Sequence, residues 1–256
     1  MTVGTPHLAV SVVIPVRDDA RRLDRCLRAL AVQTVAPSEV IVVDNGSSDD
    51  SVAVARAHGA VVLHEASIGI PAASTHGLDA ASSEVIARID ADSQLPPNWV
   101  EHLTAVFDDP TVDAASGRGW FPSLPAGLSR VTAFFYFGAY TLAVGAAIGR
   151  PPLFGSAMAV RRSLWNRVRG EVCRLDGELH DDIDLSIHLP RDCRVVIDPG
   201  LSVGISSRPF AKPATLPRRF RRGFHTIVSH WPAEAPWRRY RREIRGRLGW
   251  SCAGRG

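Results

Sequence analysis

Residues 10–20 read VSVVIPVRDDA, and this stretch decides the fold. The run from Val10 to Pro15 is short, uncharged and β-branched, which predicts a strand buried on both faces of a parallel sheet. From Asp19 to Leu30, apolar residues recur at helical spacing. A strand followed by a helix is the first half of a βαβ unit.

The same alternation continues to about residue 90. Further strands are predicted over 40–43, 60–64 and 85–89, and helices over 48–58, where Ser48 or Asp49 would cap, and over 72–81. Regular alternation of strands and helices predicts the α/β class, with a doubly wound, mainly parallel sheet flanked by helices.

The composition bounds the class of protein. The chain has 256 residues, of which 45% are hydrophobic and 22% charged. These values suit a globular protein and exclude a disordered or fibrous one. Its four cysteines are scattered without a C-x-x-C pair, which disfavours a disulfide framework or a structural zinc site and favours a reducing compartment. No basic region precedes an apolar one near Met1, so no secretory signal is predicted.

The charge is unevenly distributed. Residues 1–207 carry 17 Lys and Arg against 24 Asp and Glu, whereas residues 208–247 carry 12 against 2. We therefore expect one domain over 1–207 and an Arg-rich, helical extension over 208–256. The extension is attracted to phosphates or is simply a solvated helical surface. It contains no nucleic-acid-binding module, so specific nucleic-acid binding is not predicted.

Acidic side chains follow several predicted strands. Ligands of such sheets bind beyond the carboxyl ends of the strands. No G-x-G-x-x-G or P-loop motif is present, so dinucleotide oxidoreductases and P-loop NTPases are poor candidates. Carboxylates reach phosphates through a divalent cation. In an extended segment Asp90 and Asp92 would face the same way and address one ligand, although an Asp-rich turn is the alternative.

Five ordered segments resemble family 2 glycosyltransferases of the GT-A fold. They are VSVVIPVRDDA (10–20), VIVVDNGSSDDS (40–51), VIARIDADSQLPPNWV (85–100), LFGSAMAVRRSLW (153–165) and LHDDIDLSIHL (179–189). The resemblance implies a nucleotide-binding half over about 8–100 and an acceptor half over about 101–207. It also implies a metal-dependent, inverting glycosyltransferase that moves one sugar from a nucleoside diphosphate sugar to an acceptor hydroxyl.

The resemblance implies roles for residues at the strand ends. Asp44 would bond the base, Asp90 would contact the ribose, and Asp92, with Asp90 beside it, would hold Mn²⁺ or Mg²⁺ on the diphosphate. The nucleotide-sugar-binding residues implied on these strand ends are Pro15, Arg17, Asp19, Asp44, Asp90, Ala91 and Asp92.

Two further segments carry implied roles. Asp181 and Asp182 resemble an acidic pair before a helix, in which Asp182 takes the proton of the acceptor hydroxyl and Asp181 contacts the donor. Acidic residues also stabilise helix N-termini, which is the alternative reading. Gly155 and Ser156 resemble a small-residue turn that lines the sugar and acceptor pocket, or form only a tight turn.

The chain departs from the family pattern in three places. Arg17 stands where an aromatic residue often stacks on the base, Ser74 stands where A-R-N-x-G places an arginine, and the acidic pair is Asp-Asp rather than Glu-Asp. No Q-x-x-R-W motif is present, which disfavours a processive synthase. Two alternatives remain open: a non-catalytic nucleotide-sugar-binding partner subunit, and a nucleotidyltransferase of related fold.

Residues 131–149 form an uncharged run long enough to span a membrane. A single crossing would separate Asp92 from Asp182, so we expect either a buried helix or one lying on the membrane surface. The second reading would suit a cytoplasmic protein at the inner face of the membrane with a lipid-linked or cell-envelope glycan acceptor. The aromatic residues that would support membrane contact are Trp231, Trp237, Tyr240 and Trp250. His225 and His230 could close over the site, and His180, beside the acidic pair, could contact the donor or the metal.

Overall fold

The computed structural model describes residues 8–206, 216–231 and 237. Its strands are β1 (Val10–Val16), β2 (Glu39–Asp44), β3 (Val61–His64), β4 (Val85–Arg88), β5 (Ala114–Ser116), β6 (Gly119–Trp120), β7 (Met158–Arg161), β8 (Val195–Ile197) and β9 (Val203–Gly204). Its helices are α1 (Ala20–Ala31), α2 (Ser51–Ala57), α3 (Ile70–Ala80), α4 (Trp99–Phe107), α5 (Ala126–Ile148), α6 (Arg162–Val168), α7 (Asp181–His188) and α9 (Leu216–Ser229), with short 3₁₀ turns η1 (Gly155–Ala157) and η2 (Pro199–Leu201).

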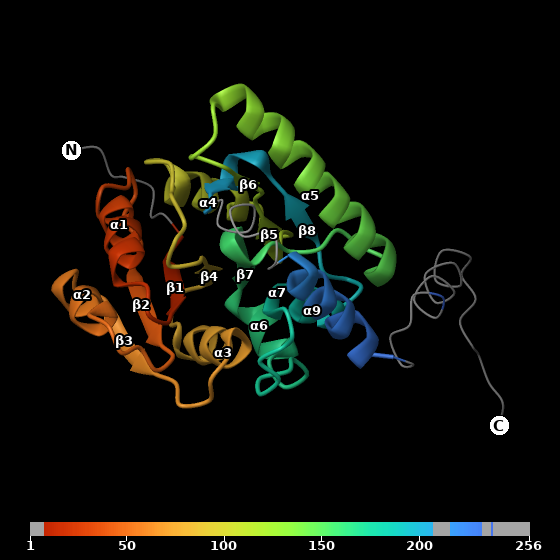
Figure 1. The fold of residues 1–256 in the computed structure, drawn as a ribbon, viewed down its shortest axis with the longest axis horizontal. Coiled ribbons are helices and arrows are strands. Elements are labelled where there is room, and N and C mark those ends of the chain that lie inside the picture. Colours follow the sequence, from red (N-terminus) through yellow and green to blue (C-terminus); the bar gives the residue numbers. More distant parts are fainter. Residues whose placement is uncertain (1–7, 207–215, 232–236, 238–256) are drawn as a thin grey trace.

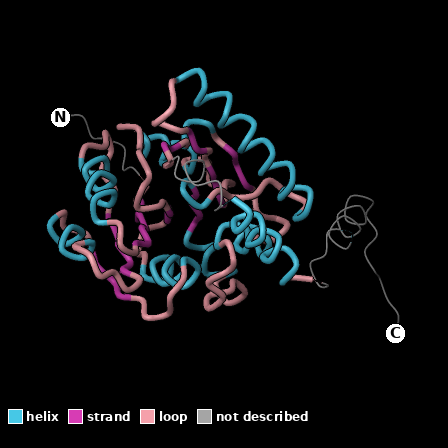
Figure 2. The backbone as a smooth tube through the Cα atoms, in the orientation of Figure 1, coloured by secondary structure: helices cyan, strands magenta, loops and turns pink. Residues whose placement is uncertain are grey.

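The main sheet has the strand order β3-β2-β1-β4-β7-β5-β8, and β6 pairs with β9 in a small second sheet (Figure 1). The first four strands are parallel, as are β5 and β8. Strand β7 runs antiparallel to both of its neighbours, β4 and β5. The prediction of a mainly parallel, doubly wound sheet flanked by helices is therefore confirmed, and Figure 2 shows helices on both sides of the strands.

Alternate residues of the strands enter two cores. Val12 and Ile14 of β1 pack with the apolar side of α1 and α4, whereas Val13 packs with residues of α3, α6 and α7. Helix α3 approaches the sheet closely, since a Cβ on Gly77 would lie 2.3 Å from Val13 Cγ1. Burial on both faces explains the uninterrupted apolar runs in these strands.

The start of α2 differs from the prediction. The helix begins at Ser51, after Asp50, rather than at Ser48 or Asp49. The Asp49 carboxylate is used elsewhere, because it accepts hydrogen bonds from the backbone N–H groups of Ala20 and Ser51. It ties the loop before α2 to the first turn of α1.

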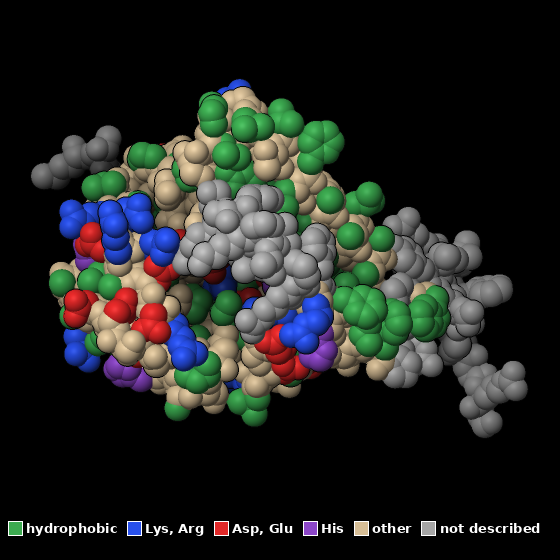
Figure 3. Space-filling view, viewed as in Figure 1, with side chains coloured by type: hydrophobic (Ala, Val, Ile, Leu, Met, Phe, Trp, Pro, Cys, Tyr) green, Lys and Arg blue, Asp and Glu red, His purple; other side chains and the backbone are tan. Residues whose placement is uncertain are grey.

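Helix α5 is a surface helix, so the expectation of a buried helix is wrong. Only 17% of its most apolar 18-residue window is buried, although its length and composition would allow it to cross a membrane. Its exposed residues leave hydrophobic side chains along that edge of the molecule (Figure 3). The strands before and after it, β5 and β7, pair with each other. In this fold both ends of α5 therefore lie on the same side of any membrane.

Helix α9 belongs to the basic segment and packs on α7. The Thr226 hydroxyl accepts a hydrogen bond from the His180 backbone N–H at 2.9 Å, and Arg222 donates to the carbonyls of Gly177 and Leu179. The Trp231 and Trp237 rings lie 5.3 Å apart. Most of the predicted extension, including Tyr240 and Trp250, lies outside the described residues, and the boundary at 207 stays a prediction.

Candidate active site

A buried arginine lies at the carboxyl end of β4. The Arg88 side chain is 3% exposed, and its Nη1 donates to Asp90 Oδ1 at 2.6 Å while Nε lies 3.2 Å from Asp181 Oδ2. Burial alone would lower the pKa of Arg88, but the carboxylates of Asp181, Asp90 and Asp182 raise it instead. Arg88 is thus a fixed cation that joins the end of β4 to the start of α7.

Ser74 of α3 completes this contact. Its hydroxyl donates to Asp181 Oδ2 at 2.7 Å and accepts from Arg88 Nε at 3.3 Å. The arginine that the family pattern places on α3 is absent from position 74. A guanidinium nevertheless stands beside that position, because Arg88 supplies it from the neighbouring strand.

Asp182 has a different environment from Asp181. Its Oδ2 accepts from the Gly155 backbone N–H at 2.9 Å and from the Tyr140 hydroxyl at 3.4 Å. Burial, together with the negative charge of Asp181, raises the pKa of Asp182, while His180 and Arg88 act in the opposite direction. Burial and the Asp182 charge also raise the pKa of Tyr140. Asp182 is therefore a more basic carboxylate than an ordinary aspartate.

The turn η1 lies between these groups. A Cβ on Gly155 would lie 2.9 Å from Arg88 Nη1 and 3.3 Å from Asp182 Oδ2, so the site requires glycine there. The Ser156 hydroxyl donates to Asp90 Oδ2. The predicted small-residue turn is present, and it contacts the acidic side chains at the ends of β4 and α7.

Asp90 and Asp92 do not lie in an extended segment, so that expectation is wrong. Residues 90–93 form a turn in which the Ser93 backbone N–H donates to the Asp90 carbonyl at 3.0 Å. The Asp90 carboxylate faces Arg88 and Ser156, whereas Asp92 lines a pocket of about 390 Å³. Ala91 between them is buried at 7% exposure.

The pocket beside Asp92 combines charges of both signs. Arg22 and Arg25 of α1 line it together with Ser123 and Ser206. Arg22 also donates to Asp19 Oδ1 at 2.6 Å, so one of the implied base-binding residues is held at the rim through Arg22. Two guanidinium groups and a carboxylate suit a phosphate ligand carried with a hard divalent cation.

The remaining implied nucleotide residues lie at the ends of β1 and β2. Pro15 is half-buried and Arg17 is exposed. Asp44 is 5% exposed, accepts from the Ser47 N–H at 3.1 Å, and lies 3.3 Å from Nδ1 of His64. The structure places them at the edge that the strand pattern predicted.

The three histidines singled out in the sequence, His180, His225 and His230, have different partners. His180 precedes α7 and lies close enough to Asp182 to influence its pKa. His225 pairs with Asp176 at 2.9 Å, and His230 lies 2.9 Å from Asp184 Oδ1. The last two thus engage acids outside the proposed site.

The sequence analysis missed two residues of the site, Arg88 and Tyr140, and it noted Ser74 only as a departure from the family pattern. Arg88 had a usable signal, because an arginine ends the otherwise apolar strand Val85–Arg88 directly before Asp90. A charged side chain in a strand that is buried on both faces needs a counter-charge. Tyr140 gave no comparable signal.

A comparison with models of protein families shows to which family the chain belongs. The model of glycosyl transferase family 2 matches residues 11–165, which is more than half of the chain. The chain belongs to this family. That membership confirms the resemblance drawn from the five sequence segments.

Curated relatives of this family 2 protein match over part of their length. Glycosyltransferase AglE of Haloferax volcanii is 32% identical over 117 residues, 43% of this chain and 38% of the relative. The pre-mycofactocin glycosyltransferase of Mycobacterium tuberculosis is 40% identical over 123 residues, 45% of this chain and 24% of the relative. The aligned region thus spans well under half of each of these relatives.

Solved structures share the fold. The mannosyltransferase PcManGT of Pyrobaculum calidifontis, in complex with GDP-Man and Mn²⁺, has a TM-score of 0.60 at 21% identity, covering 78% of this chain and 57% of its own. Glucosyl-3-phosphoglycerate synthase of Mycobacterium tuberculosis, in complex with Mn²⁺, UDP and glucosyl-3-phosphoglycerate, has a TM-score of 0.59 at 20% identity, covering 87% and 79%. At this identity the likeness establishes the GT-A fold.

Proposed function

We propose that this family 2 protein is a metal-dependent, inverting glycosyltransferase that moves one sugar from a nucleoside diphosphate sugar to an acceptor hydroxyl. The observation that carries the proposal is the meeting of β4, η1 and α7 around Arg88. There Asp181, which pairs with Arg88, lies beside Asp182, whose pKa is raised by burial and by the charge of Asp181. Family membership and the fold support the same reaction.

Asp182 is proposed as the general base. Its raised pKa makes it a better proton acceptor than a free aspartate, while the neighbouring Asp181 is paired directly with Arg88. The acceptor oxygen would form its bond to the anomeric carbon as its proton passes to Asp182. The bond to the nucleoside diphosphate breaks on the opposite face, and the configuration is inverted.

The donor is proposed to lie along the carboxyl ends of the strands. Asp44 would bond the base near Pro15, Arg17 and Asp19, and Asp90 and Ala91 would line the ribose side. Asp92 fits a hard cation, because it presents a carboxylate to the pocket that Arg22 and Arg25 line. Mn²⁺ or Mg²⁺ held there would neutralise charge on the departing diphosphate. Asp90, whose two oxygens already face Arg88 and Ser156, is the weaker candidate ligand.

Thermal unfolding tests donor binding. A ligand that binds only the folded state raises the melting temperature. We expect one series of nucleoside diphosphates and their sugars to do so only with Mn²⁺ or Mg²⁺, and Asp92→Asn to abolish the shift. A chain that shows no shift with any nucleotide would contradict the proposal.

Product analysis separates the two alternatives. A nucleotidyltransferase would consume a nucleoside triphosphate, whereas the proposed enzyme releases a nucleoside diphosphate and gives a product of inverted anomeric configuration. A non-catalytic partner subunit would bind the nucleotide sugar without turnover, and Asp182→Asn would change nothing. Nuclear magnetic resonance of the product anomer and chromatography of the nucleotide distinguish all three results.

We further propose that the acceptor is carried by a lipid and that α5 lies against an anionic membrane surface. The exposed side chains that support this proposal are Leu128, Val131, Phe134, Phe135 and Leu142. A groove of about 520 Å³ runs beside them, with Arg118 and Arg150 among its lining residues. Apolar side chains next to guanidinium groups suit acyl chains next to phosphates.

Flotation with liposomes tests the membrane proposal. We expect the protein to float with vesicles that contain anionic phospholipid, and the double variant Phe134→Ser, Phe135→Ser to remain at the bottom of the gradient. Val32→Ser, which changes an exposed apolar residue at the end of α1, is the matched control. Wild-type protein that stays entirely in the soluble fraction would overturn this part of the proposal.

A further inference from the structure

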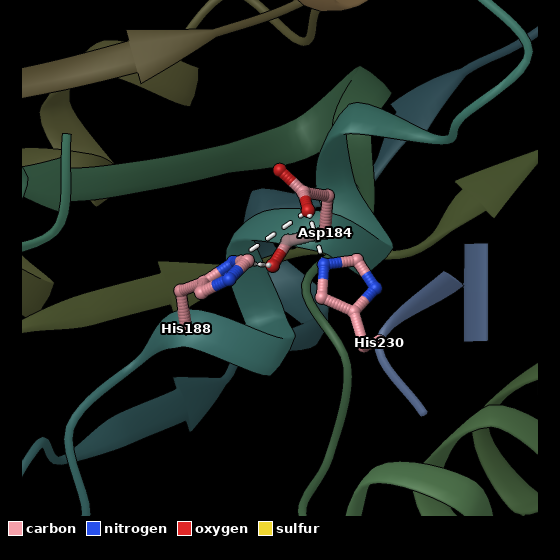
Figure 4. A group of neighbouring side chains, drawn as sticks. All are labelled: Asp184, His188 and His230. Atoms are coloured by element: carbon pink, nitrogen blue, oxygen red, sulfur yellow. Dashed lines mark hydrogen bonds and ion pairs between the residues drawn. The ribbon is translucent and has the colours of Figure 1, made fainter. Parts of the chain in front are cut away.

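A second group of potential metal ligands lies on α7, apart from Asp182. Asp184 and His188 are four residues apart and therefore share one face of the helix. His230, which follows α9, approaches them from the neighbouring helix (Figure 4). One carboxylate oxygen and two imidazole nitrogens all lie within 4.8 Å of one another.

The distances suit a small cation. His230 Nε2 lies 2.9 Å from Asp184 Oδ1, and His188 Nδ1 lies 3.5 Å from the same oxygen. Ligands at zinc bond lengths in a tetrahedral site lie about 3.3 Å apart, between these two values. Both imidazoles thus lie near this spacing from the Asp184 oxygen, and their ligand nitrogens lie within 4.8 Å of each other.

The orientation of His230 adds a second observation. Its Nδ1 lies within hydrogen-bond distance of the Thr226 carbonyl, at 2.6 Å, and donates its proton there. That contact directs Nε2 at the Asp184 carboxylate. Metal-binding histidines commonly donate the other ring N–H to a carbonyl, which fixes the nitrogen that binds the ion.

Asp184 shows an unmet demand for positive charge. Its side chain is 2% exposed, and Oδ2 accepts the Cys173 backbone N–H at 2.8 Å. Oδ1 is fully buried and accepts no well-aligned hydrogen bond, although both imidazoles approach it. A buried carboxylate oxygen that faces two imidazole nitrogens requires a cation between them, either a proton or a metal ion.

We propose that Asp184, His188 and His230 form a zinc site that fastens α9 to α7. Two imidazoles and one carboxylate favour Zn²⁺ over Mg²⁺ or Ca²⁺, which prefer oxygen ligands. His188 Nδ1 donates a hydrogen bond to the Asp184 backbone carbonyl at 2.9 Å, so Zn²⁺ binding at Nδ1 would replace this hydrogen bond and place the ring proton on Nε2. The cysteine pattern disfavoured a structural zinc site, but this site uses no cysteine.

The role of this ion is structural and separate from the proposed donor metal. Helix α7 begins with Asp181 and Asp182, and α9 contacts it at His180 through Thr226. Zn²⁺ on the later turns of α7 would hold the same two helices together at the other end of their contact. The site would therefore fix the position of the helix that carries the proposed base.

Zinc titration of the metal-stripped full-length protein tests the proposal. Zn²⁺ alone is the probe, in competition with a chromophoric chelator, and thermal unfolding is the second readout. We expect one tight site per chain, an affinity at least about 100-fold weaker in His188→Gln and His230→Gln, and a melting temperature that Zn²⁺ raises only in proteins with the site.

Two controls make the result specific. His225→Gln changes a neighbouring histidine that pairs with Asp176, and it should bind Zn²⁺ like the wild type. Asp92→Asn removes the proposed donor ligand and should also leave this site intact. Circular dichroism confirms that each variant is folded, and if one histidine variant is not, the other decides.

Replacement of Zn²⁺ by Co²⁺ gives an independent signature. Visible absorption bands of tetrahedral Co²⁺ should be present in the wild type and absent in the two histidine variants. Wild-type protein that binds Zn²⁺ no more tightly than His188→Gln or His230→Gln would overturn the proposal. The cluster would then be a buried carboxylate held by a protonated histidine.

Discussion

Strands β4 and β7 pair antiparallel, and each carries a buried arginine at an opposite end of the pair. Arg88 lies opposite Met158 at the carboxyl end of β4, whereas Arg161 lies opposite Val85 at the other end. Arg161 donates to the carbonyls of Val112, Phe107 and Asp109 at 2.7–3.0 Å and to the largely exposed carboxylate of Glu84. Arg88 is instead surrounded by carboxylates.

The partners of the two arginines indicate different roles, structural for Arg161 and functional for Arg88. The carbonyls around Arg161 are neutral groups of a chain reversal, and the arginine satisfies their hydrogen bonds. The carboxylates around Arg88 carry like charges that repel one another, yet the fold gathers them at the ligand-binding edge of the sheet. Negative charge concentrated at that edge and held by one cation is the arrangement expected of an active site.

The largest expected effect lies at the Arg88 end. Asp182→Asn removes the proposed base, and we expect kcat to fall by about 10²- to 10⁴-fold, because general base catalysis contributes rate of that order. Glu84→Gln, which changes an acid at the Arg161 end, should leave kcat unchanged. Steady-state release of the nucleoside diphosphate measures both. Equal losses of kcat in Asp182→Asn and Glu84→Gln would contradict the assignment of the active site to the Arg88 end of the strand pair.

Replacing each arginine by methionine compares their roles in stability. Arg88→Met leaves buried carboxylates without their cation, and loss of one partner of a buried ion pair costs about 3–5 kcal/mol. Arg161→Met leaves carbonyls without donors and should also destabilise the fold, by about 1–3 kcal/mol for each buried group left unsatisfied. Urea unfolding at neutral pH measures both losses.

The two losses should respond differently to pH. In Arg88→Met the pKa of Asp182 should rise further above its unfolded value, because Arg88 no longer opposes the effects of burial and of the Asp181 charge, so the native state binds this proton more tightly. The stability deficit of this variant should therefore shrink on acidification through that raised pKa. The deficit of Arg161→Met should not shrink in this way, because carbonyls do not titrate. Identical pH profiles would show that the environment of Arg88 is not electrostatically special.

A smaller effect is expected at Gly155. In Gly155→Ala the new methyl group would lie 2.9 Å from Arg88 Nη1, so Arg88 or η1 must shift. We expect a loss of about 1–3 kcal/mol of stability, typical of overpacking, together with a lower kcat. Gly170→Ala is the matched control, since no atom lies within 4 Å of its Cβ position. A fully active Gly155→Ala would mean that Arg88 need not stay in place.

The fold was largely predictable because β1, β2 and β4 are buried on both faces and read as uninterrupted apolar runs. The strand ends also located the acidic edge, since parallel strands bring their carboxyl ends together. A strand after Gly155 and Ser156 was an open alternative, but its antiparallel pairing with β4 was not predictable, because that pairing depends on a return of the chain after α5. The sequence left open whether α5 is buried or exposed, because an apolar sequence does not reveal whether a partner covers it.

The site was predictable as a set of acids and not as a geometry. Asp90 and Asp92 were expected to point together, but the turn over residues 90–93 directs Asp90 to Arg88 and Asp92 to the pocket. Asp181 and Asp182 have different surroundings because Ser74 donates a hydrogen bond to Asp181 and Gly155 donates one to Asp182, and both donors are distant in sequence. Such roles follow from three-dimensional packing, and residue types alone do not determine them.

The smallest expected effect is on the free energy of unfolding, which is lowered by burial of the ionised Asp182 carboxylate. Burial and Asp181 raise its pKa, so the folded state binds this proton more tightly than the unfolded state. As the pH rises from the unfolded value through the raised one, the chain loses stability. Asp182→Asn carries no titrating group and escapes this loss, so we expect it to be more stable than the wild type at neutral pH by about 1 kcal/mol.

Thermal unfolding measured between pH 4 and 7 tests this expectation. By proton linkage, the stability of Asp182→Asn relative to the wild type should increase as the pH rises. Asp176→Asn is the opposite control, because hydrogen bonding to His225 lowers the pKa of Asp176 and its ionised form stabilises the fold. That variant should be less stable than the wild type throughout this interval, because the lowered pKa of Asp176 and its unfolded value both lie below pH 4. A flat or reversed gap for Asp182→Asn would mean that the hydrogen bonds from Gly155 and Tyr140 outweigh burial. The proposed base would then be an ordinary aspartate, and the contrast with the Arg161 end would depend on Arg88 alone.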